Sequence, residues 1–475
     1  MRIAVVGAGH VGLVSAVCLA AVGHQLRVMD IDAERVVRLR DGDAPFLEPG
    51  LEELLADGLK HHRLSFSTDA SETLSDAEVI FICVDTPNRG DGGVDLSRVE
   101  AAARSIARHA PEGCVLVNRS TAPVGTAEYV RSIMLEERGS AAPVAVNPEF
   151  LAEGTAVRNF LAPDRIVIGG WDRAVIDTVA RVYAPIVERR LPVELHGYVS
   201  RPDTATTEPV PVVRSDPPTA ELVKYGANAF LAVKISFINE LASIAEELGG
   251  DITRVAEGIG LDSRIGPQFL RAGVGWGGSC FPKDIVALQG MAETRGLSAR
   301  ILRAAHEVNQ EQRQWVVRKL QRHLRTLVGR RVALLGLSFK ADTDDLRNTP
   351  SLEIATELTR LGARVRGYDP SVSTIPDEAS GCIELVDDPI KLAAGAEALV
   401  LLTEWRAFAD LDLDVIRAVM REPLLLDGRN FFDPDVARAA GFTYVAVGRA
   451  ESMPRTEPSE RPRPAEQIGL RRGTG

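Results

Sequence analysis

The sequence predicts an α/β protein: two doubly wound (Rossmann-like) domains joined by a long central helix and a helical middle domain. Three observations lead to this prediction. A glycine-rich turn links an apolar strand to a helix at the amino terminus, a second strand–turn–helix–strand pattern begins near residue 330, and an unbroken helical stretch lies between them. Apolar runs that alternate with helical patterns are typical of parallel sheets covered on both faces. A chain of 475 residues has room for two or three such domains.

Residues 2–32, RIAVVGAGHVGLVSAVCLAAVGHQLRVMDID, predict a strand, a tight turn, a helix and a second strand. Gly7, Gly9 and Gly12 fit the pattern G-x-G-x-x-G, which lets the backbone approach a pyrophosphate and the helix pack on the strand. Asp30 follows the second strand, where a carboxylate can hold both ribose hydroxyls of NAD and would repel the 2′-phosphate of NADP. The alternative is a glycine-rich turn that binds no ligand.

Two further apolar runs, CVLVNRSTAPVGT and PVAVNPEFLAEGTA, predict strands that end in polar residues. In parallel sheets, ligands bind at the carboxyl edge. The alternative for the two glutamates of the second run is the exposed first turn of a helix, which favours carboxylates. The residues that we expect at this edge are Arg119, Ser120, Thr121, Asn147, Glu149 and Glu153.

The pattern of the first domain returns near the carboxyl end. RRVALLGLSFK, followed by SLEIATELTRLGARVRGYDP, again predicts strand, turn, helix, strand and aspartate. The turn GLSFK lacks the glycines of G-x-G-x-x-G, so we expect it to bind something other than a dinucleotide. Lys340 and Arg429, at the ends of two such strands, favour a phosphate or carboxylate ligand over the alternative of ordinary solvated basic residues.

Residues 219–250 predict a helix of roughly 45 Å that connects the two domains. Lys224 and Asn228 lie four residues apart and share one face of it. The apolar residues are too many for one exposed side, so we expect burial between domains or subunits. Residues 196–218 are rich in Pro, Thr and Ser and predict a surface loop, and the tail 451–475 has a composition typical of disorder.

The stretch GVGWGGSCFPKD, residues 273–284, places one cysteine in a glycine-rich loop beside a lysine and an aspartate. Cys280 is either a small buried hydrophobe or a nucleophile. A thiolate that attacks an aldehyde creates the tetrahedral carbon from which a hydride can leave, and water then releases the acid from the thioester. We expect Lys283 and backbone N–H groups to lower the thiol pKa from about 8.5. The other cysteines, which we expect to be inert, are Cys18, Cys83, Cys114 and Cys382.

Charge and composition exclude several classes of partner. The net charge of −11 argues against nucleic acid and against an anionic membrane surface, although a site can still be locally basic. The cysteines are odd in number and lack metal or disulfide spacing, which favours reduced thiols in a cytoplasmic protein. Because a strand is predicted at once at the amino terminus, we expect no signal peptide, and because no apolar run is long enough to span a bilayer we expect no transmembrane segment.

Seven stretches, in order, resemble the UDP-glucose/GDP-mannose dehydrogenase family over about residues 1–445: GAGHVG, DGDAPFLEPGLEELL, STAPVGT, NPEFLAEG, ELVKYGANAFLAVKISFINE, FLRAGVGWGGSCFPKD and GLSFKADTDDLRNTPS. The resemblance implies that the C6 alcohol of a nucleotide sugar is oxidised twice, with two NAD molecules and no metal. We expect UDP-glucose as the substrate and UDP-glucuronate as the product. The alternatives are the same chemistry on GDP-mannose or another nucleotide sugar, and a non-catalytic nucleotide-sugar or NAD sensor.

The resemblance also implies residue roles. Cys280 matches the nucleophile, Lys224 and Asn228 the groups that contact the sugar and stabilise oxyanion charge, and Asp284 the group that orients water. Glu149 and Thr121 match residues that hold this water and handle protons. Positions that match the NAD site are Gly7, Gly9, Val11, Gly12, Asp30, Arg35, Thr86, Thr121, Glu153, Lys283 and Arg347. Those expected to contact the nucleotide sugar are Glu149, Phe150, Leu151, Lys224, Asn228, Arg264, Phe269, Leu270, Arg271, Ala272, Gly273, Gly277, Phe339, Lys340 and Arg429.

Arg264 resembles an arginine that reaches the substrate of a neighbouring subunit, which implies a homodimer or a higher homo-oligomer. The predicted domains are an NAD-binding domain (1–200), a central helical dimerisation domain that carries the cysteine loop (211–318), a nucleotide-sugar-binding domain (319–450) and the tail (451–475).

Overall fold

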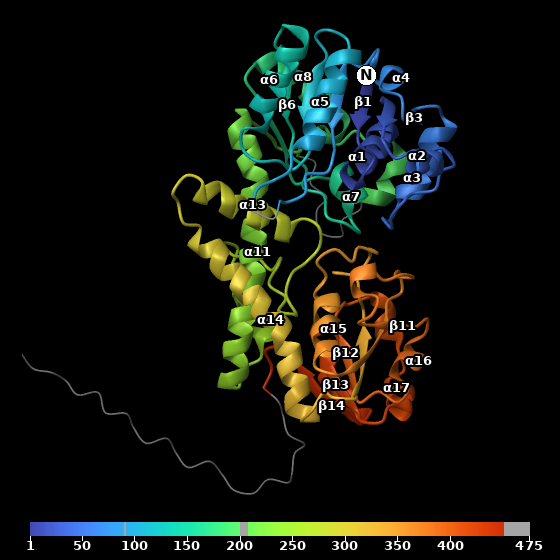
Figure 1. The fold of residues 1–475 in the computed structure, drawn as a ribbon, viewed down its shortest axis with the longest axis vertical. Helices are drawn as coiled ribbons and strands as arrows, with labels where there is room; N and C mark the ends of the chain where they lie inside the picture. The colour runs from blue at the N-terminus through green and yellow to red at the C-terminus, as the bar shows by residue number, and fades with distance from the viewer. Residues whose placement is uncertain (90–91, 200–207, 451–475) are drawn as a thin grey trace, which may run out of the picture.

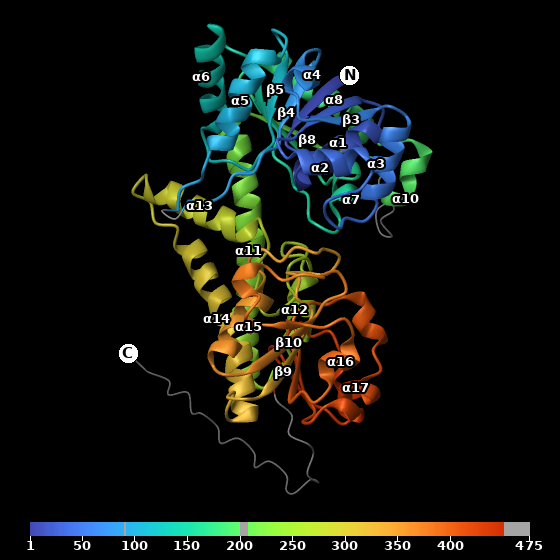
Figure 2. The same ribbon diagram turned by 45° about the vertical axis from the view of Figure 1, so that its right-hand side comes forward.

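The computed structural model describes residues 1–89, 92–199 and 208–450. Within them the chain forms two α/β units, and helix α11 (Pro217–Leu248) runs from one unit to the other (Figures 1 and 2). The predicted fold class is confirmed. The predicted tail, residues 451–475, lies outside the described residues.

The first unit is built on an eight-stranded sheet with the order β3-β2-β1-β4-β5-β6-β7-β8. Neighbouring strands run parallel except for β6 and β7, which are antiparallel to each other. The order reverses direction between β1 and β4, and at such a switch point the loops that follow the strands leave room for a ligand. The strands are β1 (Arg2–Val6), β2 (Gln25–Met29), β3 (Leu64–Ser67), β4 (Val79–Ile82), β5 (Val115–Asn118), β6 (Val144–Val146), β7 (Ile166–Gly170) and β8 (Val212–Ser215).

Alternate residues of β1 pack on opposite faces of this sheet. Ile3 and Val5 join one buried cluster, whereas Ala4 and Val6 join the other. Both faces are covered, which is why these strands are short runs of apolar residues rather than alternating ones. On the first face lie α1 (His10–Ala21), α2 (Ala33–Arg40), α3 (Leu51–Lys60), α7 (Ala156–Leu161) and α8 (Arg173–Val182), and on the second α4 (Ala70–Leu74), α5 (Ser97–His109) and α6 (Thr126–Arg138).

The stretch 196–218, predicted as a surface loop, is partly regular. It contains α10 (His196–Val199), which follows α9 (Ala184–Val187), and strand β8, which pairs with β7 although it lies beyond residue 200. The prediction of an irregular loop is therefore wrong for these residues. Local composition could not reveal that β7 offers an open edge on which β8 forms. Residues 200–207 lie outside the described residues.

The second unit has a six-stranded, fully parallel sheet with the order β11-β10-β9-β12-β13-β14. One face packs against α14 (Arg300–Leu324) and α15 (Pro350–Arg360), and the other against α16 (Pro389–Ala393), α17 (Leu413–Val419) and α18 (Pro434–Ala439). The strands are β9 (Arg331–Leu335), β10 (Arg364–Tyr368), β11 (Glu384–Leu385), β12 (Ala398–Leu401), β13 (Leu424–Asp427) and β14 (Thr443–Ala446).

Helix α11 belongs to both cores. Ala220 packs in the first unit, whereas Ile238 and Ala242 pack in the second. By length and composition alone α11 could cross a membrane. However, it carries buried polar residues and packs against β7, α12 (Ile252–Gly260), α13 (Phe281–Glu293) and α14. Its 32 residues span about 48 Å, so a single element sets the spacing of the two units.

Candidate active site

The first turn of the first unit is open to a ligand at one point. Gly7 adopts a φ of 102°, and its N–H donates to the carbonyl of Met29 at 2.8 Å. A Cβ at Gly12 would lie 1.9 Å from the carbonyl oxygen of Gly7, so this glycine lets α1 pack on the strand. A Cβ at Gly9, in contrast, would meet nothing within 4 Å. The backbone at Gly9 therefore borders open space at the start of α1, as pyrophosphate binding requires. Val11, in contrast, is partly buried and packs against the core of the first unit.

Asp30 lies beside this turn, directly after β2. The residue is 6% exposed, and its Oδ2 accepts a hydrogen bond from the N–H of Ala8 at 2.7 Å. The guanidinium of Arg35 lies 3.2 Å from both carboxylate oxygens. A carboxylate held at this place, with open backbone next to it, fits the ribose and pyrophosphate of NAD.

The loops after β4 and β5 meet the start of α13. The hydroxyl of Thr86 donates to the carbonyl of Thr121 at 2.5 Å. The Lys283 ammonium lies 3.4 Å from the Thr86 hydroxyl and 3.5 Å from the Thr121 carbonyl. The structure thus brings three residues predicted to lie near the cofactor into one cluster.

Lys224 of α11 and Glu149 form a buried ion pair. The ammonium lies 2.7 Å from Oε1 of Glu149, and the second oxygen accepts from the N–H of Leu151 at 2.6 Å. Burial alone would raise the pKa of Glu149, but Lys224 and the hydrogen bonds lower it below its ordinary value. Burial alone would lower the pKa of Lys224, but Glu149, Cys280 and Asp284 raise it. Both groups are therefore charged at neutral pH, and the alternative of an exposed helix turn is excluded for Glu149.

One turn further along α11, Asn228 reaches Asp284. Its amide donates to Oδ2 of Asp284 at 2.6 Å, and the Lys283 ammonium lies 3.1 Å from Oδ1. Both Asn228 and Asp284 are buried. A carboxylate with one fixed amide partner and one cation is suited to orienting a water molecule or a hydroxyl group.

Cys280 caps the amino terminus of α13, and its Sγ lies 3.5 Å from the hydroxyl of Ser279. Burial raises the thiol pKa above its ordinary value, Lys224 lowers it in part, and Glu149 and Asp284 raise it. The expectation of a lowered thiol pKa is wrong, because burial outweighs the cation with the largest effect, which is Lys224 and not the predicted Lys283. The resting thiol is therefore protonated at neutral pH, and it must lose its proton as it attacks.

The other cysteines have different surroundings. Cys18, Cys83 and Cys114 are buried, and burial raises the pKa of Cys83 to about 12. Cys382 is half-buried in the second unit. Lys224 lowers the pKa of Cys280 in part, whereas no lysine acts on the raised pKa of Cys18, Cys83 or Cys114.

Polar side chains that sequence reasoning missed hold the cysteine loop in place. The N–H of Trp276 donates to Asn309 at 2.7 Å, and its indole N–H donates to Ser236 at 3.0 Å. The N–H of Gly273 donates to Asn239 at 2.8 Å. The signal was present in the sequence as polar residues on the buried faces of α11 and α14, but these faces cannot be assigned before the packing is known.

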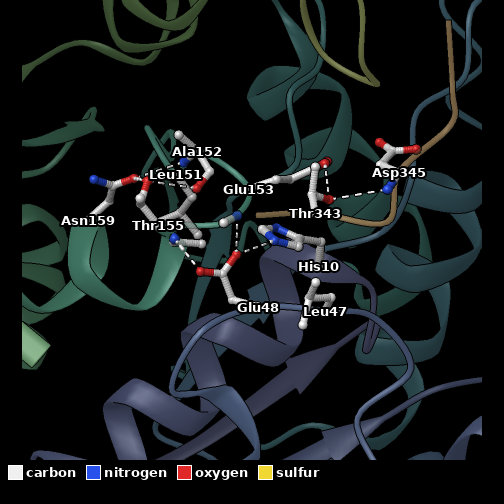
Figure 3. Close-up of polar contacts among 12 residues, drawn as sticks. His10, Leu47, Glu48, Leu151, Ala152, Glu153, Thr155, Asn159, Thr343 and Asp345 are labelled. Atoms are coloured by element: carbon white, nitrogen blue, oxygen red, sulfur yellow. Dashed lines mark hydrogen bonds and ion pairs between the residues drawn. The ribbon is translucent and has the colours of Figure 1, made fainter. Parts of the chain in front are cut away.

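Glu153 connects the two units through this loop. Its carboxylate lies 3.4 Å from the Thr343 hydroxyl (Figure 3). It also lies 3.0 Å from the Ser279 hydroxyl and 3.4 Å from the Arg347 guanidinium. Burial and the neighbouring carboxylate of Asp345 raise the pKa of Glu153.

Glu48, which no sequence argument singled out, supports the loop that carries Glu149 and Glu153. It is buried and accepts hydrogen bonds from the N–H groups of Gly154 and Ala156, both at 2.7 Å. The imidazole of His10 lies 3.2 Å from it (Figure 3). The residue lies in the quoted stretch DGDAPFLEPG, but the pattern itself assigned it no role.

Loops of the second unit pack against the cysteine loop. The Phe339 ring lies 2.8 Å from where a Cβ at Gly278 would be, and a Cβ at Gly277 would lie 2.2 Å from the carbonyl of Asn348. The Arg429 guanidinium borders Gly273 and donates to the carbonyl of Leu402 at 2.7 Å. Because Gly277 and Gly278 have no side chain, Asn348 and Phe339 of the second unit can lie close to the cysteine loop.

Lys340 is partly buried beside the same loop. Burial lowers its pKa, and Glu153, Glu48 and Cys280 raise it in part. An ammonium in such surroundings favours an anionic ligand.

The remaining predicted substrate residues lie in different surroundings. The Phe150 ring lies 3.5 Å from the Arg165 guanidinium carbon. Leu270 and Ala272 are buried, while Phe269 and Arg271 are exposed. Arg264 is also exposed and pairs with Asp262 at 2.6 Å, so the structure does not bring it to the site of its own chain.

Together these features define the class of protein, a dehydrogenase with two α/β units. A dinucleotide-binding fold lies on one side of the cysteine loop, and a second nucleotide-binding fold lies on the other. The chain belongs to the UDP-glucose/GDP-mannose dehydrogenase family. The NAD binding domain of this family matches residues 1–187 of the chain, the central domain of the family matches residues 218–311, and the UDP binding domain of the family matches residues 333–434. The resemblance predicted from the motifs and the NAD cofactor are thereby confirmed.

Individual relatives span nearly the whole chain. A UDP-glucose 6-dehydrogenase of Pseudomonas aeruginosa is 45% identical, over 94% of this chain and 98% of its own length. One from Rhizobium meliloti is 41% identical, over 95% and 100% respectively. The solved structure of a UDP-glucose dehydrogenase from Pyrobaculum islandicum is similar with a TM-score of 0.84 and 38% identity, covering 94% of this chain and 98% of that one.

Proposed function

We propose that this protein is an NAD-dependent UDP-glucose 6-dehydrogenase, which oxidises the C6 alcohol of UDP-glucose to the carboxylate of UDP-glucuronate. Each substrate loses four electrons as two hydrides, gains one oxygen atom from water and releases three protons. Hydride acceptance is the chemistry that bound NAD supplies in both oxidations. The observation that carries the proposal is the cluster of Cys280, Lys224, Asn228, Asp284 and Glu149 between the two units.

In this proposal, Lys224 and Asn228 hold the C6 oxygen and stabilise its negative charge. They lie one turn apart on α11, so a rigid helix sets their spacing. A preorganised ammonium and amide in a buried site stabilise developing charge more strongly than water does, because they need no reorganisation. The residues proposed to hold NAD beside this oxygen are those at the first turn together with Asp30, Thr86 and Lys283.

Loss of the first hydride from C6 and of the hydroxyl proton converts the alcohol to an aldehyde. Cys280 then attacks the aldehyde carbon: a carbon–sulfur bond forms, the carbonyl double bond opens, and the proton of the thiol passes to the former carbonyl oxygen. Loss of a second hydride from this carbon, together with that hydroxyl proton, leaves a thioester. Water adds to the thioester, the carbon–sulfur bond breaks, and the sulfur regains a proton. Asp284 is fixed by Asn228 at 2.6 Å and is proposed to orient this water, with Glu149 and Thr121 assisting in proton transfer.

The test is the amount of NADH formed per limiting UDP-glucose, with GDP-mannose assayed in parallel. Two NADH per UDP-glucose, with none from GDP-mannose, is the expected result. One NADH would indicate a two-electron dehydrogenase and would remove Cys280 from the mechanism. Two NADH from GDP-mannose alone would change the substrate, and no NADH from either would favour a nucleotide-sugar sensor.

We also propose that the active form is a homodimer built on α11. Large apolar side chains form an exposed stripe along this helix. The first four are spaced by seven or eight residues and the last follows one turn later: Leu222, Phe230, Phe237, Ile244 and Leu248. Large apolar side chains in such a row mark a protein interface. Light scattering of the purified protein should give twice the chain mass, and Phe230→Glu with Phe237→Glu should give the mass of a single chain.

The predicted domain limits and the cytoplasmic location are retained as proposals. The limits 1–200, 211–318 and 319–450 can be tested by limited proteolysis. The location is supported by the five free thiols, since reducing compartments keep cysteines unpaired.

A further inference from the structure

Glu221 joins the central helix to a loop of the first unit. It lies on α11 one turn before Lys224 and is 3% exposed. Its Oε2 accepts from the N–H of Gly125 at 2.7 Å, and its Oε1 accepts from the N–H of Ala127 at 2.8 Å. These N–H groups begin α6, at the end of the loop that leaves β5 and carries Thr121. One carboxylate therefore bridges two elements that carry predicted site residues.

Few ionisable groups face this carboxylate. From its own helix it faces Tyr225, whose pKa is raised by burial, by Asp284 and by Glu221. Glu128, the acidic residue in the first turn of α6, is exposed. Strands β6 and β7, which also pack on α11, carry no charged side chain. From α13, Asp284 acts on Tyr225 and Lys224.

The surroundings place the proton equilibrium of Glu221 in the neutral range. Burial raises its pKa to about 7, and the hydrogen bonds from the N–H groups of Gly125, Ala127 and Thr126 oppose this only in part. Near neutral pH, the carboxyl group is therefore present in both protonation states.

Protonation changes what this group can do. An ionised carboxylate offers only acceptors, so each oxygen can receive an N–H. A protonated carboxyl carries one O–H donor, which then faces an N–H donor from α6. At least one of these backbone hydrogen bonds is lost, and a buried donor is left without its partner.

We propose that Glu221 is a positioning residue that holds the loop carrying Thr121 against the helix carrying Lys224 and Asn228, and that protonation of Glu221 releases this loop. The inference deepens the proposed function, because Thr121 is placed there among the cofactor and proton-handling residues. The carbonyl of Thr121 is also a partner of Thr86 and Lys283. Displacement of the loop therefore disturbs the cofactor side of the site, while the core of the sheet stays intact.

The test uses Glu221→Gln, which has one acceptor and one donor end at every pH and so mimics the protonated state. NADH affinity of the full chain is measured by fluorescence between pH 5.5 and 8.5, without any sugar. For the wild type we expect an affinity about tenfold weaker at the acid end, corresponding to one hydrogen bond to a charged group. For the glutamine variant we expect the weak value throughout. A variant that reproduces the wild-type pH dependence, or a wild type without any change in this range, overturns the proposal.

Glu128→Gln is the matched control, because it removes one exposed carboxylate from the same helix terminus. It should leave the pH profile unchanged. Glu221→Asp keeps the charge but is too short to reach both N–H groups, so it should bind NADH weakly at high pH as well. This second variant keeps the proposal testable if the glutamine variant does not fold. Failure to oxidise UDP-glucose with an intact pH effect on NADH affinity would reject the proposed function but not this role of Glu221.

Discussion

The two α/β units share one turn but use its aspartate differently. In both, the first glycine has a positive φ and donates to the residue before the aspartate: Gly7 to Met29 and Gly336 to Tyr368, each at 2.8 Å. In the first unit, Asp30 accepts hydrogen bonds from the N–H of Ala8 in the turn and from the Arg35 guanidinium. Gly9 leaves open space in the same turn.

In the second unit, the equivalent Asp369 is fully occupied by the protein itself. It accepts hydrogen bonds from the N–H groups of Leu337 and Ser338 at 2.8 and 3.0 Å, and from the Trp405 indole at 3.0 Å. Ser338 stands where the first unit has Gly9. Helix α15 also starts at Pro350, 14 residues after Gly336, whereas α1 starts at His10, only three residues after Gly7. The same backbone motif thus leaves open space beside its aspartate in one unit, whereas in the other unit the aspartate is held by the protein's own donors.

The largest expected effect lies between the units. Cys280→Ala should lower acid formation by roughly three orders of magnitude or more, as loss of a nucleophile does in other enzymes, while NAD affinity and the unfolding temperature stay near wild type. Steady-state NADH production with UDP-glucose measures this. Cys382→Ala is the control, since that half-buried thiol lies in the second unit, and it should keep full activity. Full turnover by the Cys280 variant would reject the thioester route.

The two aspartates should separate binding from stability. Asp30→Ala should weaken NADH binding about 10- to 100-fold, the range for hydrogen bonds to a charged group, with a small change in unfolding temperature. Asp369→Ala should leave NADH affinity unchanged but lower the free energy of unfolding by several kcal/mol, at about 1–3 kcal/mol for each buried donor left unpaired. Fluorescence titration and urea unfolding of both variants measure this. Equal NADH affinity in wild type and Asp30→Ala would remove the ribose assignment.

Exchange of the third turn residue sharpens the comparison. Gly9→Ser places the residue of the second unit into the first turn. The new Cβ meets nothing in the protein, so the fold should be unaffected, but it enters the space proposed for the pyrophosphate. We expect NADH affinity to fall about tenfold, or roughly 1.4 kcal/mol. Ser338→Gly is the counterpart and should change stability but not NADH affinity. A Gly9→Ser variant with wild-type affinity would show that the cofactor does not approach this backbone.

The smallest expected effect concerns a repeated contact at the start of each sheet. Glu78 accepts from the N–H of Arg2 at 2.7 Å, and Glu397 accepts from that of Arg331 at 3.0 Å. Glu397 is 3% exposed, whereas the Glu78 side chain is 43% exposed. Glu397→Gln should therefore cost about 1–3 kcal/mol of unfolding free energy, and Glu78→Gln less than about 1 kcal/mol.

The pH dependence of these two variants has a defined sign. The N–H of Arg2 lowers the pKa of Glu78, and for Glu397 the N–H of Arg331 and the side chain of Arg330 outweigh burial to give the same direction. Their stabilisation is present above the ordinary glutamate pKa and is lost as the pH falls through the lower folded value. Urea unfolding at pH 7 and pH 3 should show the variants converging on wild type at the acid end. A constant difference at both pH values would contradict this assignment.

Those parts of the fold and of the candidate site that depend on residues close together in the chain could be predicted from the sequence, whereas the parts that depend on distant partners could not. The strands, the glycine turn, α11 and the polar residues after each strand follow from local patterns, because burial on both faces demands apolar runs and a tight turn demands glycine. β8 and α10 were missed because they form on partners distant in the chain. Sequence proximity favoured Lys283, three residues from Cys280, whereas the cation with the largest effect on the thiol is Lys224 of another element.

The sequence by itself determined the fold class, the family, the NAD cofactor and the cysteine as the candidate nucleophile, since each of these depends on residues close together in the chain. Only the tertiary structure decided which side chains position them. Glu48 and Glu221 each hold a loop through two backbone N–H groups, and Asp369 closes the second turn. The physical reason is that a carboxylate acquires such a role from burial and from donors supplied by other elements, and neither is encoded in its neighbours along the chain.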